Sequence, residues 1–352
     1  MGKSVGALLR NLEGPILLTG HTGFKGTWLM RYLDFLNVDV IGYSLPPEPD
    51  SLYLRSNLMG KHVEEFGDIR DYAKFEEFAQ RNKPAVILHL AAQALVSDSY
   101  VDPIGTFETN VIGTANVLAI SKNLPNVKAI GVVTTDKVYR NENKGVRFKE
   151  TDPILGSDPY SASKAATENV IEAWRRIPSE FGAPPILSLR AGNVIGGGDL
   201  SKNRLIPDLI RGFTQGNKVT IRNSESTRPW QHVLDPLSGY LRAVEFSLEN
   251  NSSETFNFGP IEKSLSVKEV VEIFQSEWLN LEISYSTTSV SNYESNFLDL
   301  DSSHAHETLE WAPKLDQINA IRKTISWWNQ HLANKKTAGA CIDEQLEEYI
   351  YT

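Results

Sequence analysis

The stretch that decides the fold is PILLTGHTGFKGTWL, residues 15–29. It begins with a short apolar run, passes three glycines spaced three apart, and ends in apolar residues at helical spacing. A buried strand that leads through glycines into a helix is typical of the first βα unit of a dinucleotide-binding domain. Because glycine lacks a Cβ, the backbone can approach a diphosphate at the positive end of the helix. The pattern therefore predicts dinucleotide binding by Gly20, Gly23, Phe24, Lys25 and Gly26, with a merely tight turn as the alternative.

Alternating strand and helix signals continue to about residue 190. Strands are expected at 15–19, 39–43, 84–90, 127–133 and 186–190, and helices at 26–37, 71–82, 106–122 and 161–176. Parallel strands need crossover helices, so this alternation predicts an α/β fold with a doubly wound parallel (Rossmann) sheet.

After residue 190 the sequence pattern changes: glycines cluster at 196–198 and the predicted elements are shorter. We expect a strand at 219–222, helices at 266–278 and 317–332, and a strand at 256–259 that returns to the main sheet. The predicted dinucleotide-binding domain is therefore 1–190 plus about 231–258. A smaller, discontinuous α/β domain for the substrate takes about 191–230 plus 259–352.

Charge and cysteine content exclude several classes of protein. With 35 Lys and Arg against 44 Asp and Glu, the net charge is −9, which argues against broad nucleic-acid binding. A single cysteine, Cys341, allows neither an internal disulfide nor a metal site of several cysteines. No apolar run approaches about 20 residues, so no membrane span is predicted. We expect a cytoplasmic protein without a metal, in which His21, His89 and His232 serve packing or loops.

The nicotinamide cofactor is not fully specified by these residues. An NAD site usually carries an acidic residue at the end of the second strand, where this chain has Tyr43 and Ser44. NAD is the expected cofactor, and NADP stays open. Asp68, followed by Ile69, could contact the adenine, or it could be the N-cap of the next helix.

Two polar groups suit acid–base chemistry. Tyr160 and Lys164 stand four apart on a predicted helix, so they share a face. A nearby ammonium favours the phenolate, which predicts a lowered tyrosine pKa and a general base. Thr135, Asp136 and Lys137 follow the strand at 127–133, at the strand end where open α/β sheets bind ligands. The alternative for this cluster is a turn with a solvated ion pair.

At these residues the chain resembles the extended short-chain dehydrogenase/reductases that act on nucleotide sugars. Within them it is similar to the CDP-glucose 4,6-dehydratases. The resemblance covers residues 14 to about 328, and its most specific motifs are GHTGFKGTWL (20–29), HLAAQ (89–93), TDK (135–137), YSASK (160–164), RAGNVIGGGD (190–199) and RPWQHV (228–233).

The resemblance implies roles for matching positions. Tyr160 would deprotonate the sugar 4-hydroxyl, Thr135 would hydrogen-bond that hydroxyl, and Lys164 would hold the nicotinamide ribose. Asn110 matches a structural asparagine of the family. The cofactor cleft would be lined by Leu90, Ala91, Ala92 and Gln93, and the nucleotide diphosphate would be held by Asn193, Arg204, Leu205 and Arg228.

The resemblance also implies a reaction. The pair Asp136–Lys137 is typical of dehydratases of CDP-sugars, whereas those of dTDP-sugars show Asp-Glu. C4 would be oxidised, water lost across C5–C6 and hydride returned to C6. Asp136 would protonate the leaving hydroxyl, and either Lys137 or Tyr160 would be the C5 base. The family forms homodimers and homotetramers through helices such as 106–122 and 161–176.

Other functions remain open at this point. One is a 4,6-dehydratase of a different nucleotide sugar, and another is a nucleotide-sugar 4-epimerase. A non-catalytic dinucleotide-binding sensor is a third. A simple dehydrogenase of small alcohols fits less well, because residues 191–352 are more chain than it needs.

Overall fold

The computed structural model describes residues 5–177, 183–221, 223–286 and 297–351. Seven parallel strands form its central sheet, in the order β11-β6-β5-β4-β1-β2-β3. Their bounds are β1 Ile16–Thr19, β2 Val40–Ser44, β3 Val63–Phe66, β4 Val86–His89, β5 Ala129–Val133, β6 Ile186–Ala191 and β11 Thr255–Phe258. The predicted doubly wound parallel sheet is confirmed, including the late strand that returns to its edge.

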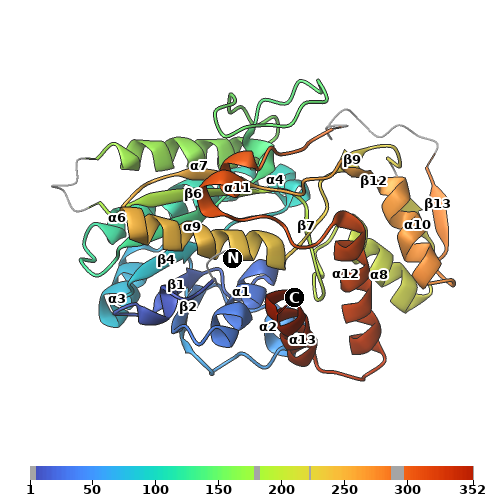
Figure 1. Ribbon diagram of the computed structural model, residues 1–352, viewed down its shortest axis with the longest axis horizontal. Coiled ribbons are helices and arrows are strands. Elements are labelled where there is room, and N and C mark those ends of the chain that lie inside the picture. The colour runs from blue at the N-terminus through green and yellow to red at the C-terminus, as the bar shows by residue number, and fades with distance from the viewer. Residues whose placement is uncertain (1–4, 178–182, 222, 287–296, 352) are drawn as a thin grey trace.

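Helices cover both faces of this sheet, as parallel strands require. One face packs on α1 (Phe24–Phe35) and α9 (Leu234–Asn250), and the other on α3 (Tyr72–Asn82), α6 (Gly113–Ser121) and α7 (Pro159–Arg175) (Figure 1). Successive side chains along β1 point to opposite faces of the sheet. Ile16 and Leu18 belong to the first core, and Leu17 between them belongs to the second.

The helix predicted at 106–122 is observed as three consecutive segments. They are α5 (Pro103–Phe107), a π-helical turn η2 (Glu108–Ile112) and α6. The π turn contains Asn110, whose carbonyl accepts hydrogen bonds from the hydroxyls of Thr114 and Thr167. Single π turns inside helices are frequent at functional sites, and they give no signal in the hydrophobic pattern.

The remaining elements gather mainly beside the carboxyl ends of the sheet, at the right of Figure 1. A parallel pair joins β7 (Val194–Ile195) to β10 (Gln231–His232), an antiparallel pair joins β9 (Thr227–Arg228) to β12 (Leu265–Ser266), and a parallel pair joins β8 (Val219–Ile221) to β13 (Ile283–Tyr285). The helices are α8 (Leu205–Gln215), α10 (Val267–Glu277), α11 (Ser303–Leu309), α12 (Gln317–Leu332) and α13 (Ala338–Tyr351). Arg222, the end of the predicted strand at 219–222, lies outside the described residues.

Short elements complete the chain: η1 (Leu9–Asn11), α2 (Leu52–Arg55), α4 (Val96–Val101) and η3 (Asp136–Val138). The terminal helix α13 packs against α1 and α12. The predicted division into two domains by residue ranges stays a prediction. None of the described helices is both long and apolar enough for a membrane span.

Candidate active site

The glycine turn lies between β1 and α1, and its backbone leaves no room for larger residues. Gly20 has a φ of +73°, and a Cβ there would lie 2.7 Å from the backbone nitrogen of Ala91. A Cβ on Gly26 would lie 2.2 Å from the carbonyl oxygen of Gly20. A Cβ on Gly23 would make only an ordinary contact, 3.4 Å from the carbonyl oxygen of Gly20. This turn at the amino end of α1 is the cradle that a cofactor diphosphate needs, so the residues present fit a dinucleotide.

The adenine side of the turn differs from the usual acidic pattern. Ser44 ends β2, and its hydroxyl lies 2.6 Å from that of Thr22. Asp68 is not the N-cap of α3, so that alternative is wrong: Asp71 caps the helix by accepting from the backbone of Lys74. The Asp68 carboxylate instead binds Arg70, whose guanidinium holds the pKa of Asp68 below its usual value. Ile69 is buried beside it.

The segment after β4 lies directly against the glycine turn. The hydroxyl of Thr19 accepts hydrogen bonds from the backbone nitrogens of Leu90 and Ala91, each at 3.2 Å. Ala92 comes next, and the backbone nitrogen of Gln93 donates to the Asn110 side chain at 2.9 Å. Two strand ends and the π turn thus hold the predicted cofactor-lining residues in place.

Tyr160 and Lys164 both lie on α7, which begins at Pro159 behind the N-cap Asp158. Tyr160 also hydrogen-bonds with Thr135. The Lys164 ammonium donates to the carbonyl of Val133, at the end of β5, at 3.2 Å. Tyr160, Lys164 and Thr135 are therefore brought together as the sequence predicted.

The prediction of a lowered tyrosine pKa is wrong for the protein without ligands. Burial raises the pKa of Tyr160 to about 12, although Thr135 and the charge of Arg204 oppose the shift. Burial also lowers the pKa of Lys164 to about 8. The physical reason is desolvation, which disfavours the phenolate and the ammonium alike and was not visible in the spacing of the two residues.

Asp136 and Lys137 form a contact in which only one partner meets solvent. The Asp136 side chain is 1% exposed, whereas that of Lys137 is 30% exposed. One carboxylate oxygen of Asp136 accepts from the Thr135 hydroxyl at 2.9 Å and lies 3.4 Å from the Lys137 ammonium. The other oxygen has no hydrogen-bond partner within the described residues. The alternative of a solvated ion pair is therefore wrong, because the carboxylate is buried.

The predicted substrate residues are less tightly gathered. Arg204 stands at the N-cap of α8, 3.6 Å from Asp199, and its charge acts on both Tyr160 and Lys25. Leu205 begins α8. Asn193 follows Gly192, at which a Cβ would lie 2.7 Å from Asp136. Arg228 lies on β9, and its guanidinium donates to the carbonyl of Thr227.

The side chain of Lys25 was predicted only as part of the glycine turn, but it extends from the turn to α9. Its ammonium lies 3.4 Å from the hydroxyl of Tyr240 on α9. Burial, together with the charges of Arg204 and Lys164, lowers the pKa of Lys25 to about 7. Lys25 therefore lies between the glycine turn and the groups around Tyr160.

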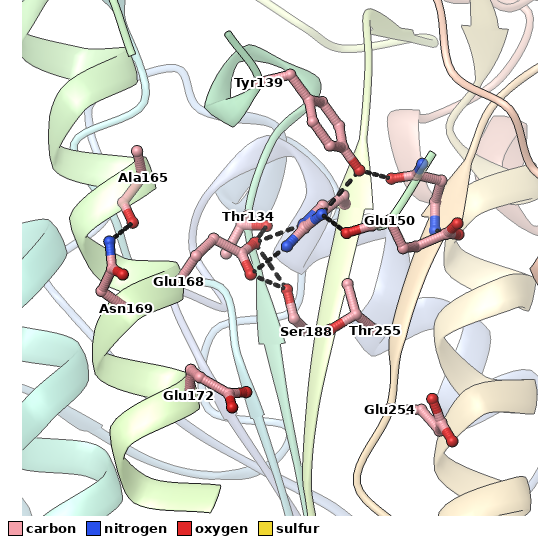
Figure 2. Close-up of polar contacts among 12 residues, drawn as sticks. Thr134, Tyr139, Glu150, Ala165, Glu168, Asn169, Glu172, Ser188, Glu254 and Thr255 are labelled. Carbon is pink, nitrogen blue, oxygen red and sulfur yellow. Dashed lines mark hydrogen bonds and ion pairs between the residues drawn. The ribbon is translucent and has the colours of Figure 1, made fainter. Parts of the chain in front are cut away.

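Sequence reasoning missed Glu168, one turn beyond Lys164 on α7. Its side chain is 4% exposed and pairs with Arg190 on β6 at 2.9 Å. Figure 2 shows the carboxylate with Thr134 and Ser188. Burial alone would raise the pKa of Glu168, but the Arg190 guanidinium and these hydroxyls hold it below its usual value. The sequence did contain a signal for this residue, because a carboxylate four residues after Lys164 lies on the same face of the helix.

The three histidines expected to serve packing or loops, His21, His89 and His232, are buried. His89 lies between the hydroxyls of Thr19 and Thr114, and burial lowers its pKa to about 3. His21 contacts Glu64 at 3.0 Å, and His232 is buried. Within the part of the chain that the structure describes, no three His, Cys, Asp or Glu residues gather as metal ligands.

Known proteins are similar to this chain in sequence and in fold. A family model described as the NAD dependent epimerase/dehydratase family matches residues 16–259. The CDP-glucose 4,6-dehydratase of Salmonella typhimurium is 37% identical over 95% of this chain and 96% of its own. The dTDP-glucose 4,6-dehydratase of Haemophilus influenzae is 27% identical over 89% and 97%.

Solved structures agree at the level of the fold. UDP-glucose 4-epimerase of Thermotoga maritima has a TM-score of 0.77 at 24% identity, covering 90% of this chain and 99% of its own. The dTDP-glucose 4,6-dehydratase of Bacillus anthracis, in complex with NAD, has a TM-score of 0.76 at 23% identity, covering 91% and 98%. The family match and the 37% identity confirm the resemblance stated from the motifs, and the family description confirms NAD as the expected cofactor. The chain belongs to the NAD dependent epimerase/dehydratase family.

Proposed function

We propose that this protein is a 4,6-dehydratase of a nucleotide-diphosphate hexose, with CDP-glucose as its first candidate substrate. The observation that carries the proposal is the buried carboxylate of Asp136, beside Thr135 and next to Lys137, with one oxygen that has no hydrogen-bond partner among the described residues. A 4-epimerase has no water to expel and needs no such acid. The nucleotide is inferred from the 37% identity to a CDP-glucose 4,6-dehydratase.

The cofactor is NAD, which when bound takes two electrons from C4 of the sugar and returns them to C6. Its diphosphate would be held at Gly20, Gly23, Phe24, Lys25 and Gly26, and its adenosine near Asp68 and Ile69. Its nicotinamide half would lie along Leu90, Ala91, Ala92, Gln93, Tyr160 and Lys164. The positive φ of Gly20 and the tight backbone approaches at Gly20 and Gly26 support this assignment.

Tyr160 is the proposed base for the first step, in which the proton of the 4-hydroxyl leaves. Thr135, which already hydrogen-bonds Tyr160, would hold the same hydroxyl. Because burial raises the pKa of Tyr160 to about 12, proton removal near neutral pH requires that positive charge approach the phenol in the complex. The ammonium of Lys164, one turn along the same helix, would supply that charge by moving closer to the phenol in the complex.

Loss of water then needs a base at C5 and an acid at C6. The 4-keto group acidifies the C5 hydrogen, and Lys137 or Tyr160 takes that proton. Asp136, in its protonated form, gives its proton to the C6 hydroxyl, which leaves as water while the C5–C6 double bond forms. The partnerless oxygen of Asp136 fits this donation. Reduction at C6 and reprotonation at C5 give CDP-4-keto-6-deoxyglucose.

The substrate diphosphate would be bound by Asn193, Arg204, Leu205 and Arg228. Guanidinium groups bind phosphate oxygens through two parallel hydrogen bonds, which suits Arg204 and Arg228. Arg204 contributes positive charge at Tyr160, so a diphosphate there would bring the sugar ring toward the phenol.

We propose further that the protein works in the cytoplasm as a homodimer or homotetramer. Large apolar side chains are exposed around α4, α5 and the π turn: Val101, Ile104, Phe107 and Ile112. Burying such a face against a second copy is favourable, at about 25 cal/mol per Å² of apolar surface.

One incubation tests the function. Purified protein with added NAD is mixed with CDP-, dTDP-, UDP- or GDP-hexoses, and the products are analysed by mass spectrometry. A dehydratase removes one water from its substrate, whereas an epimerase leaves the mass unchanged. The proposal expects water loss with CDP-glucose above the other sugars. Unchanged masses with every sugar would contradict it.

A further inference from the structure

Glu168 continues the face of α7 that carries the two predicted catalytic residues. Tyr160, Lys164 and Glu168 stand at successive intervals of four residues, so they lie one above another along the helix. The carboxylate of Glu168 points toward β5 and β6 (Figure 2). No role in the proposed reaction has so far been given to it.

Every contact of this carboxylate is with a group that donates a hydrogen bond. One oxygen accepts from the hydroxyl of Thr134 at 2.5 Å and from the Nε of Arg190 at 2.9 Å. The other accepts from Nη2 of Arg190 at 2.9 Å. The hydroxyl of Ser188 lies within 2.8 Å of both oxygens.

These donors connect α7 to the two neighbouring strand ends. Thr134 directly follows β5 and precedes Thr135, and Ser188 and Arg190 lie on β6. Thr135 in turn hydrogen-bonds Tyr160 and Asp136. The position of the phenol relative to Thr135 and Asp136 therefore depends on how α7 is held on β5. Glu168 contributes to this through Thr134, and Lys164 through the carbonyl of Val133.

Glu168 also acts on the charge of Lys164. Burial disfavours the Lys164 ammonium, and the charge of Glu168 is what opposes that effect. The other titratable groups that sense Lys164 cannot replace it. Lys25 on α1 is a cation, and burial keeps His89 on β4 neutral. Arg190 on β6 is also a cation, engaged with Glu168.

We propose that Glu168 is a positioning residue of the reaction: fixed by Arg190, its carboxylate keeps Lys164 in the ammonium form and holds Tyr160 in place against Thr135 and Asp136. The inference rests on the proposed function only for the identity of the substrate. The competing explanation is that the Glu168–Arg190 pair serves stability alone, since buried ion pairs can often be replaced by apolar residues without loss of stability.

The first test measures the protonation of Lys164 without substrate. The protein carries ¹³C-labelled lysine, and the Lys164 signal, assigned by its loss in Lys164→Arg, is followed by NMR through a pH titration. Removing the carboxylate in Glu168→Gln is expected to lower the pKa of Lys164 by about one unit. Glu172→Gln is the matched control, because Glu172 lies one turn further on α7 and is exposed. It should leave the pKa of Lys164 as it is.

A second variant keeps the test decisive if Glu168→Gln leaves Arg190 unpaired and fails to fold. In Glu168→Met with Arg190→Met both charges are replaced by apolar side chains of similar length. If the pair serves stability alone, this double variant folds and titrates Lys164 as the wild type does, which would overturn the proposal. If Glu168 has the positioning role, the double variant should fold and the pKa of Lys164 should be lower than in the wild type.

Kinetics give a third readout once a substrate is known. We expect kcat of Glu168→Gln to fall about 10-fold to 100-fold with a nearly unchanged KM, because misplacement of reacting groups by about 1 Å can cost that much. The basic limb of the pH profile should move to lower pH, since Lys164 loses its proton earlier. Glu168→Asp, which keeps the charge, should restore that limb. A protein that converts no nucleotide sugar contradicts the proposed function, but the NMR titration still decides the role of Glu168.

Discussion

Two polar clusters meet at consecutive residues after β5, and they differ in how completely their hydrogen bonds are made. The Glu168 cluster (Thr134, Glu168, Ser188 and Arg190) surrounds one carboxylate with three donor side chains. The cleft cluster (Lys25, Thr135, Asp136 and Tyr160) leaves one Asp136 oxygen without a partner within the described residues. In the part of the chain that the structure describes, the Lys25 ammonium has one long hydrogen bond of 3.4 Å, to Tyr240.

The difference separates structure from chemistry. A buried polar group without a partner costs free energy, about 1–3 kcal/mol, so folding alone would not favour it. A satisfied cluster fixes geometry, whereas incomplete groups gathered at a strand end are available to a ligand. We therefore expect substitutions in the cleft cluster to affect ligand binding and turnover more than stability. Substitutions in the Glu168 cluster should affect stability more than ligand binding and turnover, except at Glu168, for which we propose a positioning role.

The largest effect is expected from Tyr160→Phe in the cleft cluster. Loss of the proposed base should lower the rate of C4 oxidation by about 10²- to 10⁴-fold. The measurement is the near-ultraviolet absorbance of reduced nicotinamide after CDP-glucose is added to the protein with NAD. Melting temperature serves as the control for folding. Wild-type absorbance changes in this variant would remove Tyr160 from the mechanism.

Asp136→Asn should come next, with a loss of about 10²-fold in dehydration. The amide keeps the shape of the side chain but cannot deliver the proton to the C6 hydroxyl. Oxidation at C4 should continue, so reduced nicotinamide is expected to accumulate while water loss, followed by mass spectrometry, slows. If both steps slow equally, Asp136 acts before the dehydration step.

Lys25→Met is expected to weaken NAD binding about 10-fold, because a charge-assisted hydrogen bond to a diphosphate is lost. Lys25→Arg, which keeps the charge, is the control. With a pKa of about 7, Lys25 carries its charge below that pH and loses it above. Wild-type affinity for NAD, measured by calorimetry, should thus be higher at pH 6 than at pH 8. A pH dependence that persists unchanged in Lys25→Met would show that another group causes it.

The smallest effect is expected from Ser188→Ala in the Glu168 cluster. The carboxylate keeps Thr134 and Arg190 as donors, so the free energy of unfolding should fall by only about 1 kcal/mol. Urea unfolding measures this, and NAD affinity, measured by calorimetry, should stay at the wild-type value. A large loss of NAD affinity would show that the two clusters are not separable.

Much of the fold could be predicted because periodicity reports burial directly. The strands at 15–19 and 127–133 and the helix at 161–176 are each observed within a few residues of their predicted bounds. The π turn around Asn110 could not be predicted, since it depends on tertiary hydrogen bonds that Asn110 accepts from Thr167 and from the backbone of Gln93. The same holds for Asp68, whose carboxylate binds Arg70 while Asp71 caps the helix.

The sequence by itself determined the glycine turn, the alternation of strands and helices, and the shared face of Tyr160 and Lys164, because these depend on residue spacing along the backbone. Only the tertiary structure decided which charges are desolvated. Burial in the tertiary structure raised the pKa of Tyr160. The tertiary structure also buried Asp136 with one oxygen that has no hydrogen-bond partner among the described residues. The carboxylate of Glu168, on α7, reaches the neighbouring strands β5 and β6. Hydrogen bonding and dielectric environment depend on neighbours far apart in the chain, and residue spacing carries no record of them.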